Sequence, residues 1–244
     1  PLRLVVTAGD DGLKAAQQWT ELIRTLDLEF GVQLTIVAED GEARRLLASR
    51  EAEAAVLDPV SYIAHGPGLS VVAIIARNGK PYVRFSLIVP RASIYHRMID
   101  LRYPRVAFRG LTADSARTYA FAWARSEGAF ESGSSEEMAL DSYDSVLRAV
   151  ALGEADAGFV PSDLLADQAG SVLIERVREL GASPAVPFAL LVMYDDLSPP
   201  RKRLIESLAV QLLQSGKSDF IALPDAELPL VLAAMAEALH AAPR

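Results

Sequence analysis

Cysteine is absent from this sequence of 244 residues. The chain therefore has no disulfide, no thiolate nucleophile, no cysteine-bearing zinc site and no iron–sulfur cluster. Long apolar runs are also missing: the run Val71–Ala76 is typical, and a membrane span needs roughly 18 residues. The first residues, Pro1–Arg3, lead directly into a strand pattern rather than into a secretion signal. We therefore expect either a cytosolic protein or a chain whose signal sequence has been removed.

Basic residues are in the minority, and their scarcity bears on the choice of partner. The 24 Lys and Arg residues are outnumbered by 32 Asp and Glu residues, which gives a formal net charge of −8. Nucleic-acid binding depends on clustered basic residues, so we expect no nucleic-acid partner. The apolar share of 51% is typical of a folded globular chain and excludes an intrinsically disordered one.

Catalytic and cofactor-binding motifs are missing as well. The sequence contains no G-x-S-x-G nucleophile elbow, no H-E-x-x-H zinc motif, no phosphate-binding P-loop and no dinucleotide-binding fingerprint. His65, His96 and His240 lie far apart and form no ligand pair at helical spacing. We therefore expect neither an enzyme nor a bound metal or cofactor.

The first part of the chain alternates strand patterns with helix patterns. Leu2–Val6, Val32–Val37 and Ala54–Leu57 are strand-like, and residues 13–30 and 41–49 space their apolar side chains as amphipathic helices do. This β-α-β-α-β order predicts an α/β layer with a parallel sheet. Next come two extended runs, 70–76 and 82–89. They flank Asn78-Gly79, a strong hairpin signal.

After Pro90 the same alternation starts again. The predicted strands are 105–108, 155–160 and 172–177, and the predicted helices include 114–126, 143–152, 199–214 and 228–239. A chain that leaves one α/β unit and returns through a second extended crossing forms two lobes with a cleft between them. The two hinge segments are expected near 87–90 and 188–191. The expected lobes are 1–88 plus 191–244, and 91–188. The alternative is one doubly wound sheet with an antiparallel hairpin at its edge.

Polar and aromatic side chains gather at the predicted element ends that would face such a cleft. Helix N-termini favour anions, and open α/β sheets bind ligands beyond the carboxyl ends of their strands. For Thr112, Ser115, Ser162 and Asp163, simple helix capping is the alternative role. The candidate ligand-binding residues are Asp58, Ser61, Tyr62, Tyr82, Arg84, Thr112, Asp114, Ser115, Arg117, Tyr143, Ser162 and Asp163.

Four segments carry a resemblance to a known family. They are residues 54–65 (AAVLDPVSYIAH), 82–89 (YVRFSLIV), 101–108 (LRYPRVAF) and 143–158 (YDSVLRAVALGEADAG). Together they resemble the phosphate/phosphite/phosphonate-binding family of periplasmic substrate-binding proteins of ABC transporters, and the likeness extends to the closing helix after residues 220–223. The resemblance implies a type II periplasmic binding protein fold, in which each lobe is a mixed, mostly parallel sheet flanked by helices. It also implies one small ligand clamped between the lobes, an extracytoplasmic location and a membrane permease as partner. We expect a monomer.

The sequence departs from the family pattern at several positions, and these departures leave the identity of the ligand open. The family's Ser-Thr-Ser-like anion-binding run corresponds here to 113–115, where only Ser115 carries over. A carboxylate about 4 Å from a phosphate costs roughly 1 kcal/mol in water and roughly 4 kcal/mol at an effective dielectric of 20. Asp114 therefore disfavours an oxyanion, unless it points away or pairs with Arg117. Arg117 or Arg84 could supply the positive charge instead.

Three further departures concern the family's remaining ligand-facing positions. Tyr143 stands where the family often has His, Pro161 replaces an acidic residue, and Thr7-Ala8-Gly9 stands where an aromatic residue is expected.

The leading hypothesis is a solute-binding protein for a small oxyanion such as phosphate, phosphite or phosphonate, held by Thr112, Ser115 and an arginine. A zwitterionic or polar organic ligand is the main competing hypothesis. Its cationic part would meet Asp114 or Asp58, and it would stack on Tyr62, Tyr82 or Tyr143. The sequence is also compatible with the periplasmic sensory domain of a signalling protein such as a sensor kinase, with an enzyme on the same fold, and with a protein–protein module that has lost its ligand.

Overall fold

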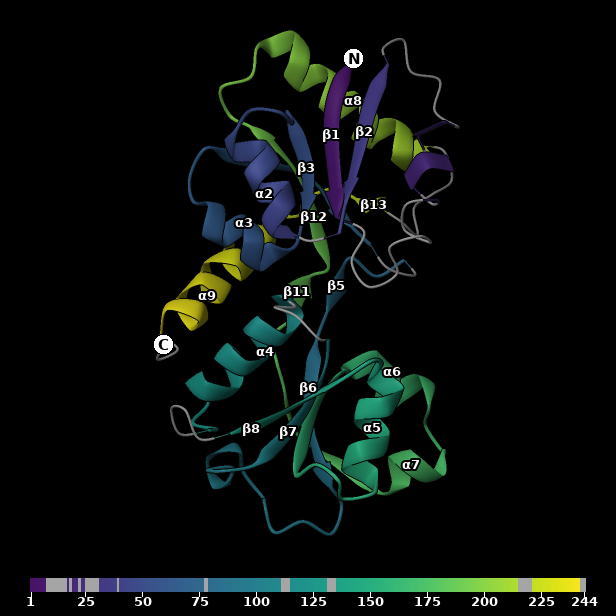
Figure 1. The fold of residues 1–244 in the computed structure, drawn as a ribbon, viewed down its shortest axis with the longest axis vertical. Helices are drawn as coiled ribbons and strands as arrows, with labels where there is room; N and C mark the ends of the chain where they lie inside the picture. The colour runs from purple at the N-terminus through teal and green to yellow at the C-terminus, as the bar shows by residue number, and fades with distance from the viewer. Residues whose placement is uncertain are drawn as a thin grey trace. The chain divides into compact units, whose positions relative to one another are not determined.

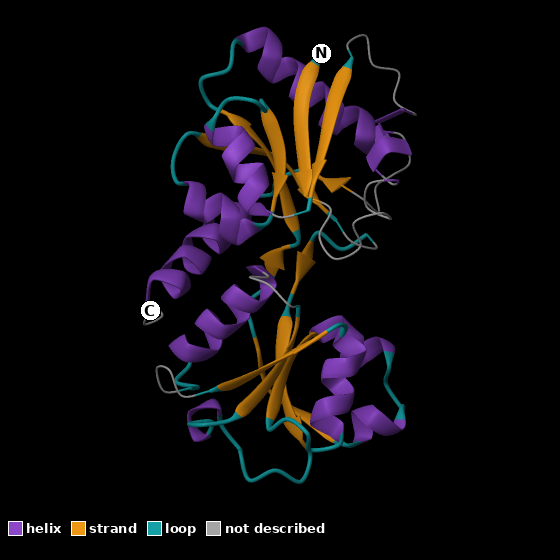
Figure 2. Cartoon of the chain, viewed as in Figure 1, coloured by secondary structure: helices purple, strands orange, loops and turns teal. Residues whose placement is uncertain are grey.

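The computed structural model of the protein describes residues 1–7, 17, 19–21, 23–24, 31–38, 40–76, 79–110, 115–130, 135–214 and 221–241. The chain divides into two compact units, which Figures 1 and 2 show as ribbons. The first unit comprises Pro1–Tyr82 and Pro187–Pro229, and the second comprises Val83–Val186 and Leu230–Arg244.

The first unit is built on a six-stranded sheet with the order β13-β4-β12-β3-β1-β2. Strand β1 pairs in parallel with β2 and β3, whereas β12 runs antiparallel to both β3 and β4, and β13 runs antiparallel to β4. The strands are β1 (Leu2–Thr7), β2 (Val32–Val37), β3 (Ala54–Leu57), β4 (Leu69–Ile75), β12 (Ala189–Tyr194) and β13 (Ile221–Ala222). The sheet is thus mixed, as expected: β1, β2, β3 and β4 run in one direction, and β12 and β13 run in the other.

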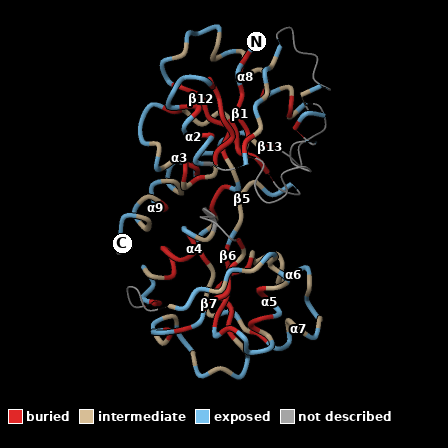
Figure 3. Tube along the Cα trace, viewed as in Figure 1, coloured by how far each residue is buried: buried red, intermediate tan, exposed pale blue. Residues whose placement is uncertain are grey.

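Helices flank this sheet, and the core lies between the layers (Figures 2 and 3). They are α2 (Asp40–Ala48), α3 (Pro59–His65) and α8 (Pro199–Gln214), and residues 17, 19–21, 23 and 24 are also helical within the expected helix 13–30. From α8, Ile205, Leu208 and Leu212 follow a three- and four-residue spacing and join the buried strand residues in one cluster. Trp19 packs into the same cluster.

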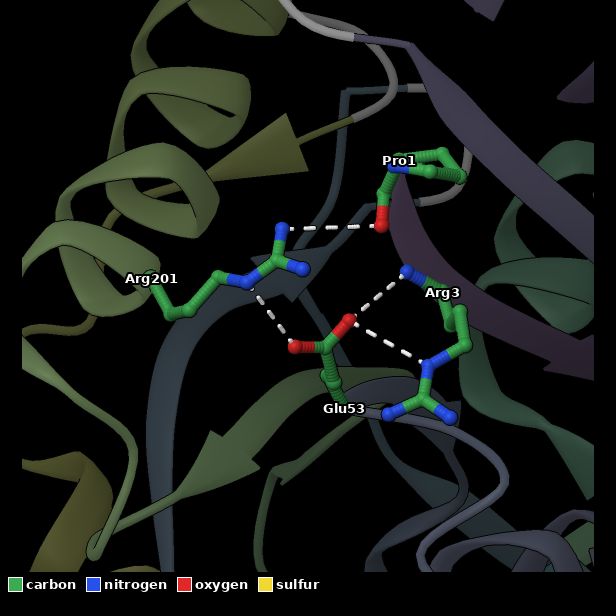
Figure 4. A network of polar contacts seen from close by, with 4 residues as sticks. All are labelled: Pro1, Arg3, Glu53 and Arg201. Atoms are coloured by element: carbon green, nitrogen blue, oxygen red, sulfur yellow. Dashed lines mark hydrogen bonds and ion pairs between the residues drawn. The ribbon is translucent and has the colours of Figure 1, made fainter.

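A buried carboxylate fastens the start of the chain to this unit (Figure 4). Glu53 is 7% exposed. Its Oε2 accepts hydrogen bonds from the backbone N of Arg3 at 3.1 Å and from the Arg3 Nε at 3.4 Å. Its Oε1 lies 3.2 Å from Nε of Arg201, whose guanidinium also donates to the carbonyl of Pro1 at 3.5 Å. Strand β1, the start of β3 and helix α8 are therefore tied together by one charged group.

The chain passes between the units through two short strands, β5 (Tyr82–Val83) and β11 (Val186–Pro187), which form a two-stranded sheet of their own. The hairpin expected around Asn78-Gly79 is wrong: β4 pairs with β12 and β13, whereas β5 pairs with β11 and β6 (Phe85–Pro90) lies in the other unit's sheet. Asn78 itself lies outside the described residues. A local turn signal cannot outweigh the long-range pairing that buries these strands.

The second unit contains a five-stranded sheet with the order β10-β6-β9-β7-β8. Strand β7 lies between β9 and β8 and is parallel to both, and β6 runs antiparallel to both β9 and β10. The remaining bounds are β7 (Arg105–Arg109), β8 (Glu136–Leu140), β9 (Ala157–Pro161) and β10 (Val177–Ala182). Since β6 belongs here, the unit begins at Val83 rather than near the expected residue 91.

Helices cover both faces of this sheet, and the strands alternate their side chains between them. Ala107 and Val160 pack with α5 (Tyr143–Ala151), while Phe108 and Phe159 pack with Phe121 of α4 (Ser115–Ser126). The other helical segments are η2 (Met98–Asp100), α6 (Ser162–Asp167) and α7 (Val172–Glu175). Residues 172–175 were expected to be extended, but the Ser171 hydroxyl caps them as a helical turn.

The last helix, α9 (Leu228–Ala241), is grouped with the second unit from Leu230 onward, although we expected it in the first lobe. Among the residues that the structure describes, none of the helices combines the length and apolar character needed to cross a membrane.

Candidate functional site

A small hollow opens in the second unit at the carboxyl ends of its parallel strands. Arg109 at the end of β7 and Tyr143 at the start of α5 contribute polar groups, and Arg117 contributes a third from the first turns of α4. The remaining lining residues are apolar: Phe85, Phe108, Ala120 and Phe159. Two arginines thus line a hollow at the carboxyl ends of parallel strands, where open α/β sheets bind their ligands.

Arg117 is held by aromatic rings and by one carboxylate. Its guanidinium carbon lies 4.5 Å from the ring centre of Phe108 and 5.6 Å from that of Phe121. The same guanidinium forms an ion pair with Glu137 of β8. Its Nε is buried and has no hydrogen-bond partner in the described structure. Stacking on aromatic rings restricts the arginine side chain, so little entropy is lost when an anion binds to it.

Arg109 and Tyr143 form the other side of the hollow. The guanidinium carbon of Arg109 lies 5.1 Å from the centre of the Tyr143 ring. Tyr143 is placed by the Ser142 cap of α5, whose hydroxyl accepts a hydrogen bond from the backbone N of Ser145 at 3.1 Å. The structure therefore brings the predicted residues Arg117 and Tyr143 to one hollow and adds Arg109.

Ser162 and Asp163 begin helix α6 in the same unit, but neither lines the hollow. The Ser162 hydroxyl lies 2.7 Å from that of the fully buried Ser86, which donates to Oε2 of Glu179 at 2.5 Å. The Ser162 hydroxyl is thus already engaged within the protein. Arg84 is exposed, and its carbonyl accepts the backbone N–H of Ser162 at 2.9 Å.

Asp58, Ser61 and Tyr62 lie together in the first unit, at the start of α3. Asp58 caps the helix, since its Oδ1 accepts a hydrogen bond from the backbone N of Ser61 at 2.9 Å. Its Oδ2 is buried and has no hydrogen-bond partner among the described residues. Tyr62 donates its hydroxyl to the carbonyl of Leu69 at 3.3 Å, and burial, aided by the charge of Asp195, raises its pKa. Capping accounts for one Asp58 oxygen and leaves the other uncompensated.

Tyr82 is engaged within the first unit. Its hydroxyl donates to Oδ1 of Asp225 at 2.8 Å. Burial, the hydrogen bond to Asp225 and the charges of Asp225 and Glu227 all raise the pKa of Tyr82. The same carboxylate oxygen accepts the backbone N–H groups of Glu227 and Leu228 and so caps α9. The Tyr82 hydroxyl is therefore already hydrogen-bonded within the protein.

Thr112 and Asp114 lie outside the described residues, and Ser115 is described only as the first residue of α4. The expected pairing of Asp114 with Arg117 therefore stays a prediction, while Glu137 is the partner that the structure gives to Arg117. Sequence reasoning missed Arg109 and Glu137. Arg109 directly follows the predicted strand 105–108, so its position at a strand's carboxyl end was a usable signal.

Comparison with known proteins places this chain in a family. A family model described as an ABC transporter phosphonate periplasmic substrate-binding protein matches residues 4–225. No curated protein matches the sequence.

Solved structures share the fold across nearly the whole chain. Chloride-bound XAC2383 from Xanthomonas citri has a TM-score of 0.74 at 14% identity, covering 98% of this chain and 97% of its own. PhnD1 from Prochlorococcus marinus, in complex with methylphosphonate, has a TM-score of 0.65 at 13% identity, with 98% of each chain covered. The aliphatic sulphonate-binding protein SsuA from Escherichia coli has a TM-score of 0.57 at 15% identity, covering 98% of this chain and 86% of its own. The chain belongs to the phosphonate-type family of periplasmic substrate-binding proteins of ABC transporters, and it has the type II periplasmic binding protein fold.

Proposed function

We propose that this protein binds a small oxyanion, with a phosphonate as the leading candidate, and delivers it to an ABC permease. The observation that carries the proposal is the pair of guanidinium groups, Arg109 and Arg117, at the hollow of the second unit. Family membership supports the transport role, and the solved PhnD1 and SsuA structures hold or are named for organic oxyanions. Enclosure of the ligand between two lobes stays a prediction.

Arginine suits this task for a geometric reason. Its planar fork presents two parallel N–H donors, which match two oxygens of a phosphonate, phosphate or sulfonate group. The family's hydroxyl-rich run is reduced here to Ser115, so charge takes over part of the recognition that hydroxyls provide elsewhere. A ligand held by charge should lose affinity as salt rises, because ions screen exposed charges.

The test is a thermal-shift and calorimetric screen with phosphate, phosphite, methylphosphonate and methanesulfonate. A ligand at 100 times its dissociation constant stabilises the folded protein by about 2.7 kcal/mol, which gives a clear shift in Tm. Arg117→Ala should abolish the shift. Arg125→Ala is the matched control, because it removes the same charge from the same helix at a residue that does not line the hollow. Equal loss in both variants, or none in either, would count against the site.

One observation favours a zwitterionic ligand as the second candidate. The buried Oδ2 of Asp58 has no partner in the described structure, and a ligand ammonium group would complete it. Asp58→Asn keeps a side-chain oxygen that can cap α3 but removes the charge. If the ligand is zwitterionic, this variant should weaken binding of 2-aminoethylphosphonate and leave binding of methylphosphonate unchanged. Equal affinities for both compounds in both proteins would exclude this candidate.

A further inference from the structure

Arg117, which we propose contacts the oxyanion, already forms an ion pair with a carboxylate of the protein itself. Glu137 projects from β8 to Arg117, and the two side chains are only partly exposed, at 35% and 28%. A carboxylate offers the same pair of oxygens to a guanidinium fork that a phosphonate or sulfonate offers. Glu137 therefore occupies Nη2 of Arg117, a donor that an incoming oxyanion needs.

The geometry points to Glu137 as a built-in competitor that sets the affinity and selectivity of the oxyanion site. This inference rests on the proposed function, because it assigns the regulation of that same site. A ligand must displace the Glu137 carboxylate from Arg117 to form a forked contact, so only oxyanions that bind the guanidinium better than a carboxylate does are retained. Carboxylic acids are disfavoured, since they offer the arginine nothing that Glu137 does not already supply.

Glu137 is not the only group that holds Arg117 in place. The guanidinium lies against the rings of Phe108 and Phe121, with the carbon 4.5 Å and 5.6 Å from the two ring centres. Phe108 and Phe121 are both buried, and their rings pack against each other with centroids 5.8 Å apart. These contacts remain when the carboxylate is removed. Loss of Glu137 should therefore free the donors of Arg117 without releasing its side chain.

The displacement is energetically accessible because the pair is not deeply buried. Partly exposed ion pairs stabilise proteins only weakly, since solvent screens the charges and two long side chains must be ordered. The Nε of Arg117 is buried and has no partner in the described structure, so the protein itself leaves the guanidinium incompletely satisfied. A ligand with three oxygens can supply more acceptors than the two oxygens of Glu137.

The neighbouring residue provides a matched control. Glu136 precedes Glu137 on β8, and its carboxylate pairs with Arg105, with 3.2 Å between Oε1 and Nε. Its side chain is 69% exposed, and successive residues of a strand point to opposite faces. Glu136→Gln and Glu137→Gln change the net charge equally, so a general electrostatic effect on anion binding would be the same in both.

The experiment measures Kd by isothermal titration calorimetry for inorganic phosphate, methylphosphonate, methanesulfonate and acetate. Glu137→Gln should tighten binding of the best oxyanion by about two- to fivefold, the range expected for removing one partly exposed competing ion pair. It should also bring acetate into the measurable range. Glu136→Gln should leave every Kd within about twofold, and Arg117→Ala should remove the gain when it is combined with Glu137→Gln. Glu137→Ala repeats the test without any side-chain amide.

The outcomes separate the two proposals. If the wild-type protein binds an oxyanion and Glu137→Gln binds it equally or more weakly, Glu137 positions the arginine or plays no part. The inference is then overturned, while the proposed function stands. An equal gain in Glu136→Gln overturns it in the same way. If only Glu137→Gln binds, the inference holds and the wild-type protein is not a receptor for these anions. If neither protein binds any of them, both proposals fail.

Discussion

Gly158 lies where helix α5 packs closely on the second sheet, so it provides a sharp test of that packing. A Cβ built at this position would lie 2.8 Å from Val146 Cγ1 and Val150 Cγ2, and 3.3 Å from the carbonyl oxygen of Ala107. An ordinary carbon–carbon contact is about 3.5–4.0 Å, so the helix must retreat by roughly 1 Å to admit one methyl group. Overpacking of this kind costs about 1–3 kcal/mol.

The assay is urea unfolding of Gly158→Ala, followed by circular dichroism, together with a thermal melt. We expect a lower urea midpoint and a fall in Tm of about 2–4 °C for each kcal/mol lost. Gly41→Ala is the control, because a Cβ there meets nothing within 4 Å and the residue lies in helix α2. Alanine favours a helix over glycine, so this variant should be as stable as wild type or slightly more stable.

A double-mutant cycle tests the cause. Val150→Ala removes one of the two methyl-bearing groups that obstruct the new Cβ. Gly158→Ala should therefore cost less in that background, with a coupling of about 1 kcal/mol. Because α5 begins at Tyr143, the single variant should also weaken oxyanion binding at the hollow. A Gly158→Ala protein with wild-type stability would refute the close packing of α5 on β9.

Three further predictions concern other parts of the chain. Glu53→Gln should lower the free energy of unfolding by about 1–3 kcal/mol, because Arg3 and Arg201 lose a buried charged acceptor. Glu51→Gln is the control, because Glu51 pairs with Arg45 at the surface. Its free energy of unfolding should change little in the same urea titration. Asp225→Ala removes the cap of α9 and the partner of the Tyr82 hydroxyl, and should cost about 0.5–2 kcal/mol in the same assay. Burial raises the pKa of Tyr119 to about 12, so its contribution to stability is complete below pH 10 and is lost as the pH rises through 12. Several tyrosines, Tyr62 and Tyr82 among them, should titrate above pH 10 in an absorbance titration of phenolate, and Tyr119→Phe should remove a step near pH 12. A normal titration of every tyrosine would contradict this reasoning.

Apolar periodicity located several elements of the second unit. The predicted helices 114–126 and 143–152 correspond to α4 and α5, and the predicted strand 105–108 corresponds to β7. Each of these segments carries its own apolar pattern and its own boundary residues, such as Ser142 before α5. Such local features depend on only a few neighbouring residues. The tertiary contacts of these three segments favour the same secondary structure.

Strand partners and unit boundaries were not predictable in the same way. Residues 82–89 have the composition of one strand, yet they divide into β5 and β6, which belong to different sheets. Nothing in the residues themselves says that β6 will pair with β9 and β10. That choice depends on burial between segments far apart in the sequence, and a hairpin turn signal carries no information about it.

The candidate site was predictable where a residue follows a strand or starts a helix. Arg117 and Tyr143 were found on that ground, and they lie at one hollow. Glu137 was not predicted, because it occupies an ordinary strand position. Its contact with Arg117 depends on which strand lies beside β7. Register and neighbour order decide which side chain meets Arg117, and neither is encoded locally.

Strand β12 occupies an interior position in the first sheet, between β3 and β4, but it is translated only after the whole second sheet. A nascent chain that ends before residue 189 therefore exposes the open edges of β3 and β4, whereas the strands of the second sheet are already complete. We expect truncated products of that length to aggregate through those unpaired edges, unless a chaperone covers them until the returning segment emerges. The order of synthesis thus completes the first sheet only after the second one.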